Sequence, residues 1–346
     1  MAALIVWEGG VQWLLRRLRE LGLEDAVPSP LRVALRKAAM DEQARAMLVD
    51  AETQELERYL TSRGVPSVLI KGPARRAASG RYPYADARAT QDVDVLLPEQ
   101  HVQEVWNDLR ERGWPFATDP AATPAGHYHP PPLRGPIGVT VELHSSTGHA
   151  ITTEEAWRRA NEGSLELDWN QVRVRVPSAT ELLWHGLTHA VSAGPDGFRL
   201  RFFLDAAAIL ASGAPVDWDR IVTRLAAGED ADPPVARAWL RSAAELAGFY
   251  LPASVRGVCA PFDLERVLAW RLAVLARAGR ARFAARLLDE GTRSELGLSV
   301  TPVIEGTGPF RQTRRWVAGR AARLAYGAWR VADRNVADGR LDWNMS

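Results

Sequence analysis

Two aspartates, Asp92 and Asp94, form an Asp-x-Asp pair within the run QDVDVLL. In a strand, the period of two puts both carboxylates on one face and the intervening valine on the other. Neighbouring carboxylates repel each other unless a cation lies between them, and hard oxygen ligands suit Mg²⁺ or Mn²⁺. A bare Asp-x-Asp is also common at solvated strand ends, so the pair alone leaves both interpretations open.

A third carboxylate, Glu142, lies in a second alternating run, GVTVELH. The alternation puts Glu142 and His144 on one face and three apolar residues on the other. Charged side chains on a central strand are costly to bury unless they are paired or bind a metal. We therefore predict Asp92, Asp94 and Glu142 as metal ligands and catalytic carboxylates.

Lys71 is one of only two lysines among 43 basic residues, the other being Lys37. This ratio indicates that arginine stands wherever either residue would serve, and the two are not equivalent at a phosphate. Lys71-Gly72 follows the apolar run SVLI and opens a helical Ala/Arg stretch. Glycine lets a ligand approach the backbone, and a helix N-terminus offers N–H groups to phosphate. A phosphate contact is predicted here; the alternative is a simple turn with an exposed lysine.

An ordered set of residues runs through VLIKG, YPYADARATQDVDVLL and HYHPPPLRGPIGVTVELH. The set comprises Lys71, Gly72, Tyr82, Arg88, Asp92, Asp94, His127, His129, Glu142 and His144, followed by His189 and Asp205. In this order the residues resemble the uncharacterised nucleotidyltransferase family of the DNA polymerase β-type superfamily. The likeness covers roughly residues 65 to 225. Where the wider superfamily has a Gly-Ser pair after its first strand, this chain has Lys71-Gly72.

The resemblance implies transfer of NMP from an NTP, with ATP the first candidate, to a hydroxyl, with pyrophosphate leaving. Asp92 and Asp94 would bridge Mg²⁺ or Mn²⁺ ions, and Glu142 would complete the ion nearer the acceptor and serve as base. Nucleotide binding is assigned to a second group of residues, namely Lys71, Gly72, Arg88, His129 and His144. The acceptor is left open among a small molecule, a protein side chain and an RNA end. The alternatives are a metal-dependent phosphohydrolase and a non-catalytic nucleotide-binding module.

Three further features have a weaker link to the chemistry. His127 and His129, in GHYHPPP, are expected either to bind a metal or to pack over the site. His185 and His189 have the spacing of zinc proteases, but Gly186 stands where the general base would be, which favours packing. The arginine-rich stretch 311–334 offers a surface for tRNA, an acidic protein or a membrane, although solvated arginines over buried aromatics are the commoner outcome.

These residues need an α+β scaffold with a small mixed sheet. Strands are predicted at 67–70, 92–97 and 138–144, with a hairpin from 165–168 and 172–176 and a helix over 102–112. Capping boxes at Thr152/Glu155 and Ser178/Glu181 begin two further helices. The predicted units are an N-terminal helical region 1–63, a nucleotidyltransferase core 64–176 and a C-terminal helical domain 177–346.

Composition sets limits on the class of protein. The 346 residues carry a net charge of +1, so no global field favours nucleic acid or an anionic membrane. No apolar run approaches the roughly 18 residues of a membrane span, and MAALIVWEGG lacks the features of a signal peptide. The single cysteine, Cys259, excludes an intramolecular disulfide and a cysteine-based zinc site, which predicts a cytoplasmic protein.

Overall fold

The computed structural model describes residues 9–120, 127, 129–148, 151–192, 200–229 and 233–259. Over these residues the chain is α+β, as predicted. The helices expected beyond residue 259 and the arginine-rich stretch 311–334 lie outside the described residues. Among the described helices, none is both long and apolar enough to cross a membrane.

Four strands form one mixed sheet in the order β1-β2-β4-β3. They are β1 (Val68–Leu69), β2 (Asp92–Leu96), β3 (Leu133–Arg134) and β4 (Thr140–His144). The two central strands, β2 and β4, are parallel, and an antiparallel strand flanks each of them. Strand β3 is not predicted from the sequence, because two residues next to a proline run show no alternation. Three predicted strands are confirmed with slightly shorter bounds.

A separate hairpin pairs β5 (Leu165–Trp169) with β6 (Val172–Val176), as predicted. Asn170 and Gln171 connect the strands with φ values of 51° and 66°. Positive φ at both central residues is the requirement of a type I′ turn, whose twist matches that of the strands. The three valines of β6 are buried, and β6 contacts β1, so the hairpin covers part of the main sheet.

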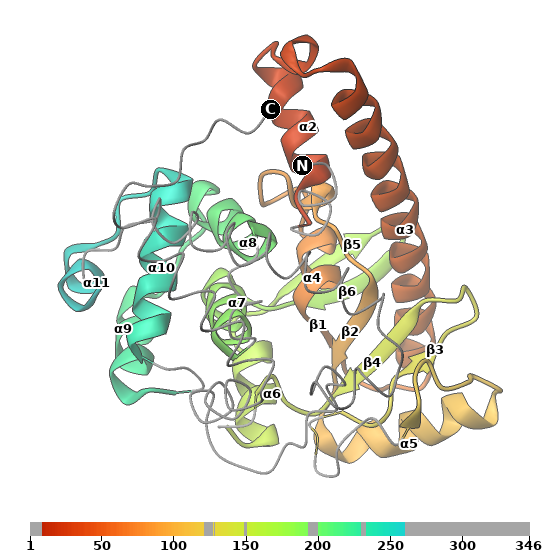
Figure 1. Ribbon diagram of the computed structural model, residues 1–346. Helices are drawn as coiled ribbons and strands as arrows, with labels where there is room; N and C mark the ends of the chain where they lie inside the picture. Colours follow the sequence, from red (N-terminus) through yellow and green to blue (C-terminus); the bar gives the residue numbers. More distant parts are fainter. Residues whose placement is uncertain are drawn as a thin grey trace, which may run out of the picture. The chain divides into compact units, whose positions relative to one another are not determined.

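Helices surround the sheet (Figure 1). Those described are α2 (Val11–Glu20), α3 (Ser29–Ser62), α4 (Lys71–Ala77), α5 (Glu99–Glu111), α6 (Thr153–Asn161), α7 (Ala179–Ser192), α8 (Leu200–Ala211), α9 (Trp218–Ala227), α10 (Pro233–Ala247) and α11 (Ala253–Val258), with 3₁₀ turns η1 (Glu24–Ala26) and η2 (Ala85–Ala87). The long helix α3 packs on β2 and β6, and α7 packs on α4 and α8. A continuous apolar cluster extends from Val49 in α3 through the sheet to α10 and α11.

Each predicted capping box supplies one of its two hydrogen bonds. The Thr152 hydroxyl accepts from the N–H of Glu155, and the Ser178 hydroxyl accepts from the N–H of Glu181. The glutamates turn to arginines instead of reaching back. Glu181 forms a buried ion pair with Arg224 on α9, at 2.8 Å. The caps therefore begin the helices, while Glu181 links α7 to α9 and Glu155 pairs with Arg158 and Arg159 within α6.

Helix α3 also holds the turn that leads into β4. The Glu52 carboxylate is fully buried and accepts hydrogen bonds from the N–H groups of Ile137 at 2.9 Å and Val139 at 3.4 Å. A Cβ at Gly135 would collide with that carboxylate, so only glycine fits there. Burial raises the pKa of Glu52, and these hydrogen bonds partly offset the effect. This contact positions the strand that carries Glu142.

Candidate active site

Four polar side chains converge at the centre of the sheet. Lys71 Nζ lies 2.6 Å from Asp94 Oδ1 and 3.6 Å from Glu142 Oε2. His144 Nε2 lies 2.9 Å from the same Asp94 oxygen and 3.3 Å from the same Glu142 oxygen. Ligand atoms of Asp94, Glu142 and His144 all fall within 4.8 Å of one another, which is compact enough for one metal ion.

Strand register brings these groups together. Because β2 and β4 are parallel neighbours, Asp94 lies directly opposite Glu142, and two residues further along the strands His144 lies opposite Leu96. The N–H of Ile70 donates to the carbonyl of Asp94 at 3.1 Å, which holds the end of β1 beside β2. Lys71 therefore emerges next to Asp94, although the two are 23 residues apart in sequence.

The backbone at Lys71-Gly72 is tightly constrained. Lys71 has φ of 50°, in the left-handed region that non-glycine residues rarely adopt. A Cβ at Gly72 would meet the Thr90 hydroxyl oxygen and would lie 2.9 Å from Nη1 of Arg88. Contacts this short are incompatible with a side chain, so glycine is required for the loop before β2 to pack here. The turn thereby directs the lysine ammonium towards the two carboxylates.

Asp92 lies two residues before Asp94 and is only partly exposed. Burial raises the pKa of Asp92 to about 6, and the negative charge of Asp94 contributes to the rise. Among the described residues, no hydrogen bond or ion pair reaches its carboxylate, and it does not belong to the compact group of Asp94, Glu142 and His144. The structure thus brings together two of the three predicted carboxylates, with the third beside them.

Asp94 and Glu142 carry negative charge at this point. Burial alone would raise the pKa of Asp94, but the charge of Lys71 and the hydrogen bond from His144 hold it well below its usual range. Burial is also the largest influence on the pKa of Glu142 and raises it, but the hydrogen bond from His144 and the charges of Lys71 and His144 together lower it below its usual value. Asp94 is buried and Glu142 is 20% exposed, and two ionised carboxylates this close together form a strong site for a cation.

Further histidines lie near the cluster of Asp94, Glu142 and His144. The rings of His129 and His144 lie 5.1 Å apart, and His127 packs 4.1 Å from His129. His185 and His189 on α7 pack with ring centroids 6.3 Å apart. Burial lowers the pKa of His189 to about 4 and that of His185 well below its usual value, and the charges of Lys71 and Asp94 act on both rings. The pair on α7 thus lies near enough to the site for its charges to act on both rings, a placement that their spacing alone does not reveal.

Comparison with family models decides the class of the chain. Residues 1–234 match the model described as uncharacterised nucleotidyltransferase, which is more than half of the chain. The chain belongs to the uncharacterised nucleotidyltransferase family. The resemblance seen in the sequence is thereby confirmed, and the chain is a nucleotidyltransferase.

Two solved structures are similar to this nucleotidyltransferase. An antigenic nucleotidyltransferase-like protein from Paracoccidioides brasiliensis is 19% identical over 51% of this chain and 80% of its own, with a TM-score of 0.33. The antibiotic-resistance factor ANT(2'')-Ia is 14% identical over 54% of this chain and 95% of its own, with a TM-score of 0.35. No curated protein matches the chain.

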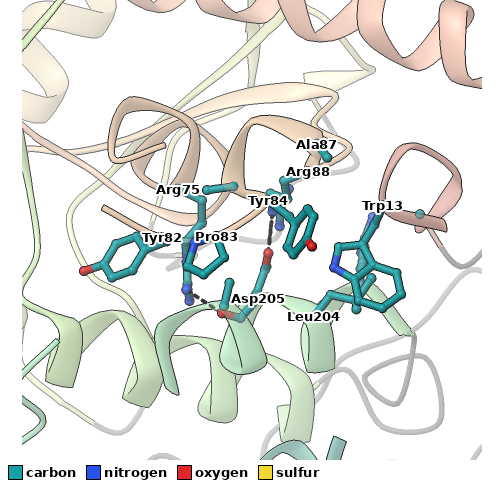
Figure 2. A pocket seen from close by; sticks show the side chains of 13 residues that line it. Trp13, Arg75, Tyr82, Pro83, Tyr84, Ala87, Arg88, Leu204 and Asp205 are labelled. Atoms are coloured by element: carbon teal, nitrogen blue, oxygen red, sulfur yellow. Dashed lines mark hydrogen bonds and ion pairs between the residues drawn. The ribbon is translucent and has the colours of Figure 1, made fainter. Parts of the chain in front are cut away.

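In this nucleotidyltransferase, Arg88 lines a small pocket together with Asp205. Figure 2 shows the Asp205 carboxylate directed at Arg88, with Trp13 and Tyr84 nearby. Arg88 Nε lies 3.1 Å from both carboxylate oxygens of Asp205, and Arg88 Nη1 donates to the carbonyl of Ala89. The predicted phosphate-binding arginine is therefore neutralised by an aspartate on α8.

The same aspartate holds a second buried cation. Arg75 Nη1 donates to the backbone carbonyl of Asp205 at 2.9 Å, and Arg75 Nη2 donates to that of Leu182 at 2.9 Å. Burial lowers the pKa of Arg75, and the charge of Asp205 counters part of that effect. Helix α4 of the nucleotidyltransferase is thus tied to α7 and α8 through residues that the sequence gives no reason to single out, because Arg75 is one arginine among many.

Proposed function

We propose that this nucleotidyltransferase moves NMP from an NTP, with ATP the first candidate, to a hydroxyl acceptor and releases pyrophosphate. The observation that carries the proposal is the facing pair Asp94 and Glu142 on adjacent parallel strands, with both carboxylates ionised beside Asp92. Their oxygens fit a divalent cation, either Mg²⁺ or Mn²⁺, because hard cations take carboxylate ligands. Asp92, Asp94 and Glu142 would hold it.

The cation would supply charge neutralisation at the reacting phosphate and at the attacking hydroxyl. The acceptor oxygen forms a bond to the α-phosphorus, and the bond to the bridging oxygen of pyrophosphate breaks in line with it. The hydroxyl proton goes to Glu142, whose carboxylate is ionised and only partly exposed. Positioning and electrostatic stabilisation account for most of the rate in such a reaction.

We assign the triphosphate to the Lys71-Gly72 turn. The Lys71 side chain is 20% exposed and its ammonium already bridges both carboxylates, so a short rotation of this flexible side chain would bring the ammonium to a phosphate. Arg88, while paired with Asp205, would add positive charge near the triphosphate. His129 and His144 would border the nucleotide.

We place the catalytic unit at 64–176 and the protein in the cytoplasm, since its one cysteine suits a reducing compartment.

The test is incubation of the full chain with NTPs labelled at the α-phosphate and candidate hydroxyl acceptors, with pyrophosphate release measured in parallel. Transfer predicts label in a product of increased mass together with pyrophosphate, and loss of both in Asp94→Asn. Release of free phosphate or nucleotide without a labelled product would identify a phosphohydrolase. Equal binding of a non-hydrolysable ATP analogue by wild type and the Asp92→Ala/Asp94→Ala variant, without turnover, would identify a non-catalytic module.

A further inference from the structure

We propose that His144 is itself a ligand of the catalytic cation, so that the site selects Mn²⁺ or another first-row transition-metal ion over Mg²⁺. This inference rests on the proposed function and adds the identity of the metal to it. It concerns the ring nitrogen Nε2, which lies between the two carboxylates that face each other across β2 and β4.

The distances are those of ligands sharing one ion. Ligand atoms bound at about 2.1 Å to a six-coordinate ion lie about 3 Å apart when adjacent. His144 Nε2 is 2.9 Å from Asp94 Oδ1 and 3.3 Å from Glu142 Oε2. A cation that contacts both carboxylate oxygens would therefore also lie within bonding reach of the imidazole nitrogen.

The imidazole is held where it is. The His144 side chain is fully buried at the end of β4, and its backbone carbonyl accepts a hydrogen bond from the N–H of Leu97 at 2.9 Å. The ring of His129 packs edge-on against it at 5.1 Å. A strand-anchored ring without exposure has little freedom to turn away when an ion arrives. On ligation, the ring would carry its proton on Nδ1 instead of Nε2.

Lys71 marks the position of the positive charge. Its ammonium lies 2.6 Å from Asp94 Oδ1 and 3.6 Å from Glu142 Oε2, which are the oxygens that His144 contacts. The side chain is flexible and partly exposed, so an entering divalent ion would displace it, whereas His144 would stay and bind. The displaced ammonium would be free to contact the triphosphate, as the proposed function requires.

The donor set decides the choice of metal. Mg²⁺ favours shells made entirely of oxygen, whereas an imidazole nitrogen adds affinity for first-row transition metals in the order of the Irving–Williams series. Two carboxylates and one imidazole therefore bind Mn²⁺, Co²⁺ or Zn²⁺ more tightly than Mg²⁺. Asp92 would supply a further oxygen, since its carboxylate accepts no hydrogen bond from the described residues.

The experiment is electron spin-echo modulation spectroscopy of Mn²⁺ added to the full-length protein, with Mn²⁺ and Mg²⁺ affinities from calorimetry. Coupling to a directly bound imidazole nitrogen is expected in the wild type and absent in His144→Gln. The same variant is expected to lose about tenfold in Mn²⁺ affinity and much less in Mg²⁺ affinity. His101→Gln is the matched control, because His101 lies on α5 and contacts Glu104 instead of the site; coupling should persist in it.

The outcomes separate the two proposals. Mn²⁺ that binds without nitrogen coupling, or coupling that survives in His144→Gln and vanishes in His129→Gln, overturns the assignment of His144 and leaves the transferase proposal intact. No binding of either ion, with or without NTP, overturns both. If His144→Gln does not fold, nitrogen coupling that persists when each of the other six histidines is replaced in turn by glutamine still assigns the ligand to His144, and coupling lost in one of those variants overturns the assignment.

Discussion

The ammonium of Lys71 lies 2.6 Å from Oδ1 of Asp94, an oxygen that His144 also contacts at 2.9 Å. One buried carboxylate oxygen thus receives a mobile cation from the end of β1 and a fixed ring from β4. The pKa of Asp94 is held low by these two neighbours in spite of burial. A carboxylate in this setting stays ionised at neutral pH and can hold a cation.

Replacement of Asp94 by asparagine is expected to reduce transfer by at least about a hundredfold, because one charged ligand of the cation is lost. The fold should persist, since Lys71 keeps Glu142 within 3.6 Å and the repulsion between Asp92 and Asp94 disappears. Turnover by product mass and unfolding by circular dichroism check the two statements. Asp41→Asn, in an exposed ion pair with Lys37, is the control. Retained turnover in Asp94→Asn would count against the mechanism.

Lys71→Arg is expected to lower kcat/KM for the NTP by about tenfold. A planar guanidinium is longer than an ammonium, and it has to fit where Nζ already lies within 2.6 Å of a buried oxygen. Steady-state kinetics with varied NTP measure the change. The chain offers a matched comparison, because its other lysine, Lys37, is exposed and forms an ion pair with Asp41. Lys37→Arg should be silent, and equal kinetics for both variants would remove Lys71 from phosphate binding.

Gly72→Ala adds a single methyl group, yet it is expected to lower both the stability and the turnover of the enzyme. The new methyl group would collide with the Thr90 hydroxyl and approach Arg88, so the loop before β2 must shift and carry Asp92 with it. We expect a loss of about 1–3 kcal/mol in unfolding free energy, measured in urea, and a fall in turnover. Gly80→Ala, where the added Cβ meets nothing within 4 Å, is the control. A fully stable and active Gly72→Ala protein would refute this account of the turn.

The ion pair of Arg88 and Asp205 is expected to be structural as well as electrostatic. Asp205→Asn leaves the buried Arg75 and the largely buried Arg88, which is 13% exposed, without their neutralising charge, and should cost about 3–5 kcal/mol. Asp86→Asn removes an exposed partner of Arg16 and should cost less than about 1 kcal/mol. Denaturant melts of the two variants give the comparison. Costs of similar size would mean that burial does not govern the Asp205 pair.

Local patterns in the sequence account for the groups that share one strand. A period of two correctly puts Asp92 and Asp94 on one face of their strand, and Glu142 and His144 on one face of theirs. The capping hydroxyls of Thr152 and Ser178 are likewise predicted from a local pattern, the three-residue spacing of a capping box. Side-chain alternation does not encode which strands are neighbours. That Asp94 faces Glu142 follows from the parallel pairing of β2 with β4, which is a contact between segments far apart in the chain.

Long-range partners explain what the sequence leaves open. Arg88 stands out as a candidate phosphate ligand, yet its carboxylate partner Asp205 lies 117 residues away. His185 and His189 have helical spacing that fits packing equally well, and only the docking of α7 on α4 turns them towards Lys71. Strand β3 is too short for any pattern. In each case the placement is decided by tertiary packing between distant segments, which secondary-structure propensity and hydrophobic periodicity do not predict.

The titration of Glu57 should contribute to the pH dependence of the free energy of unfolding. Its side chain lies in α3 and is buried, and it accepts a hydrogen bond from the Ser67 hydroxyl at 2.7 Å next to β1. Burial raises the pKa of Glu57 to about 7, from 4.5 in a solvated glutamate. The folded protein therefore keeps a proton that the unfolded chain loses, and the free energy of unfolding falls as pH rises from about 4.5 to about 7.

Removal of this titration should be visible in urea melts at pH 5 and pH 8. Glu57→Gln keeps the shape but cannot ionise, so up to about 3 kcal/mol of the decrease in stability between the two pH values should disappear. The variant is expected to equal or exceed the wild type in stability at pH 8. Glu55→Gln, on the exposed side of the same helix, should leave the slope unchanged. A wild-type slope retained in Glu57→Gln would show that another buried acid, such as Glu42, whose pKa burial raises to about 7, governs this pH range instead.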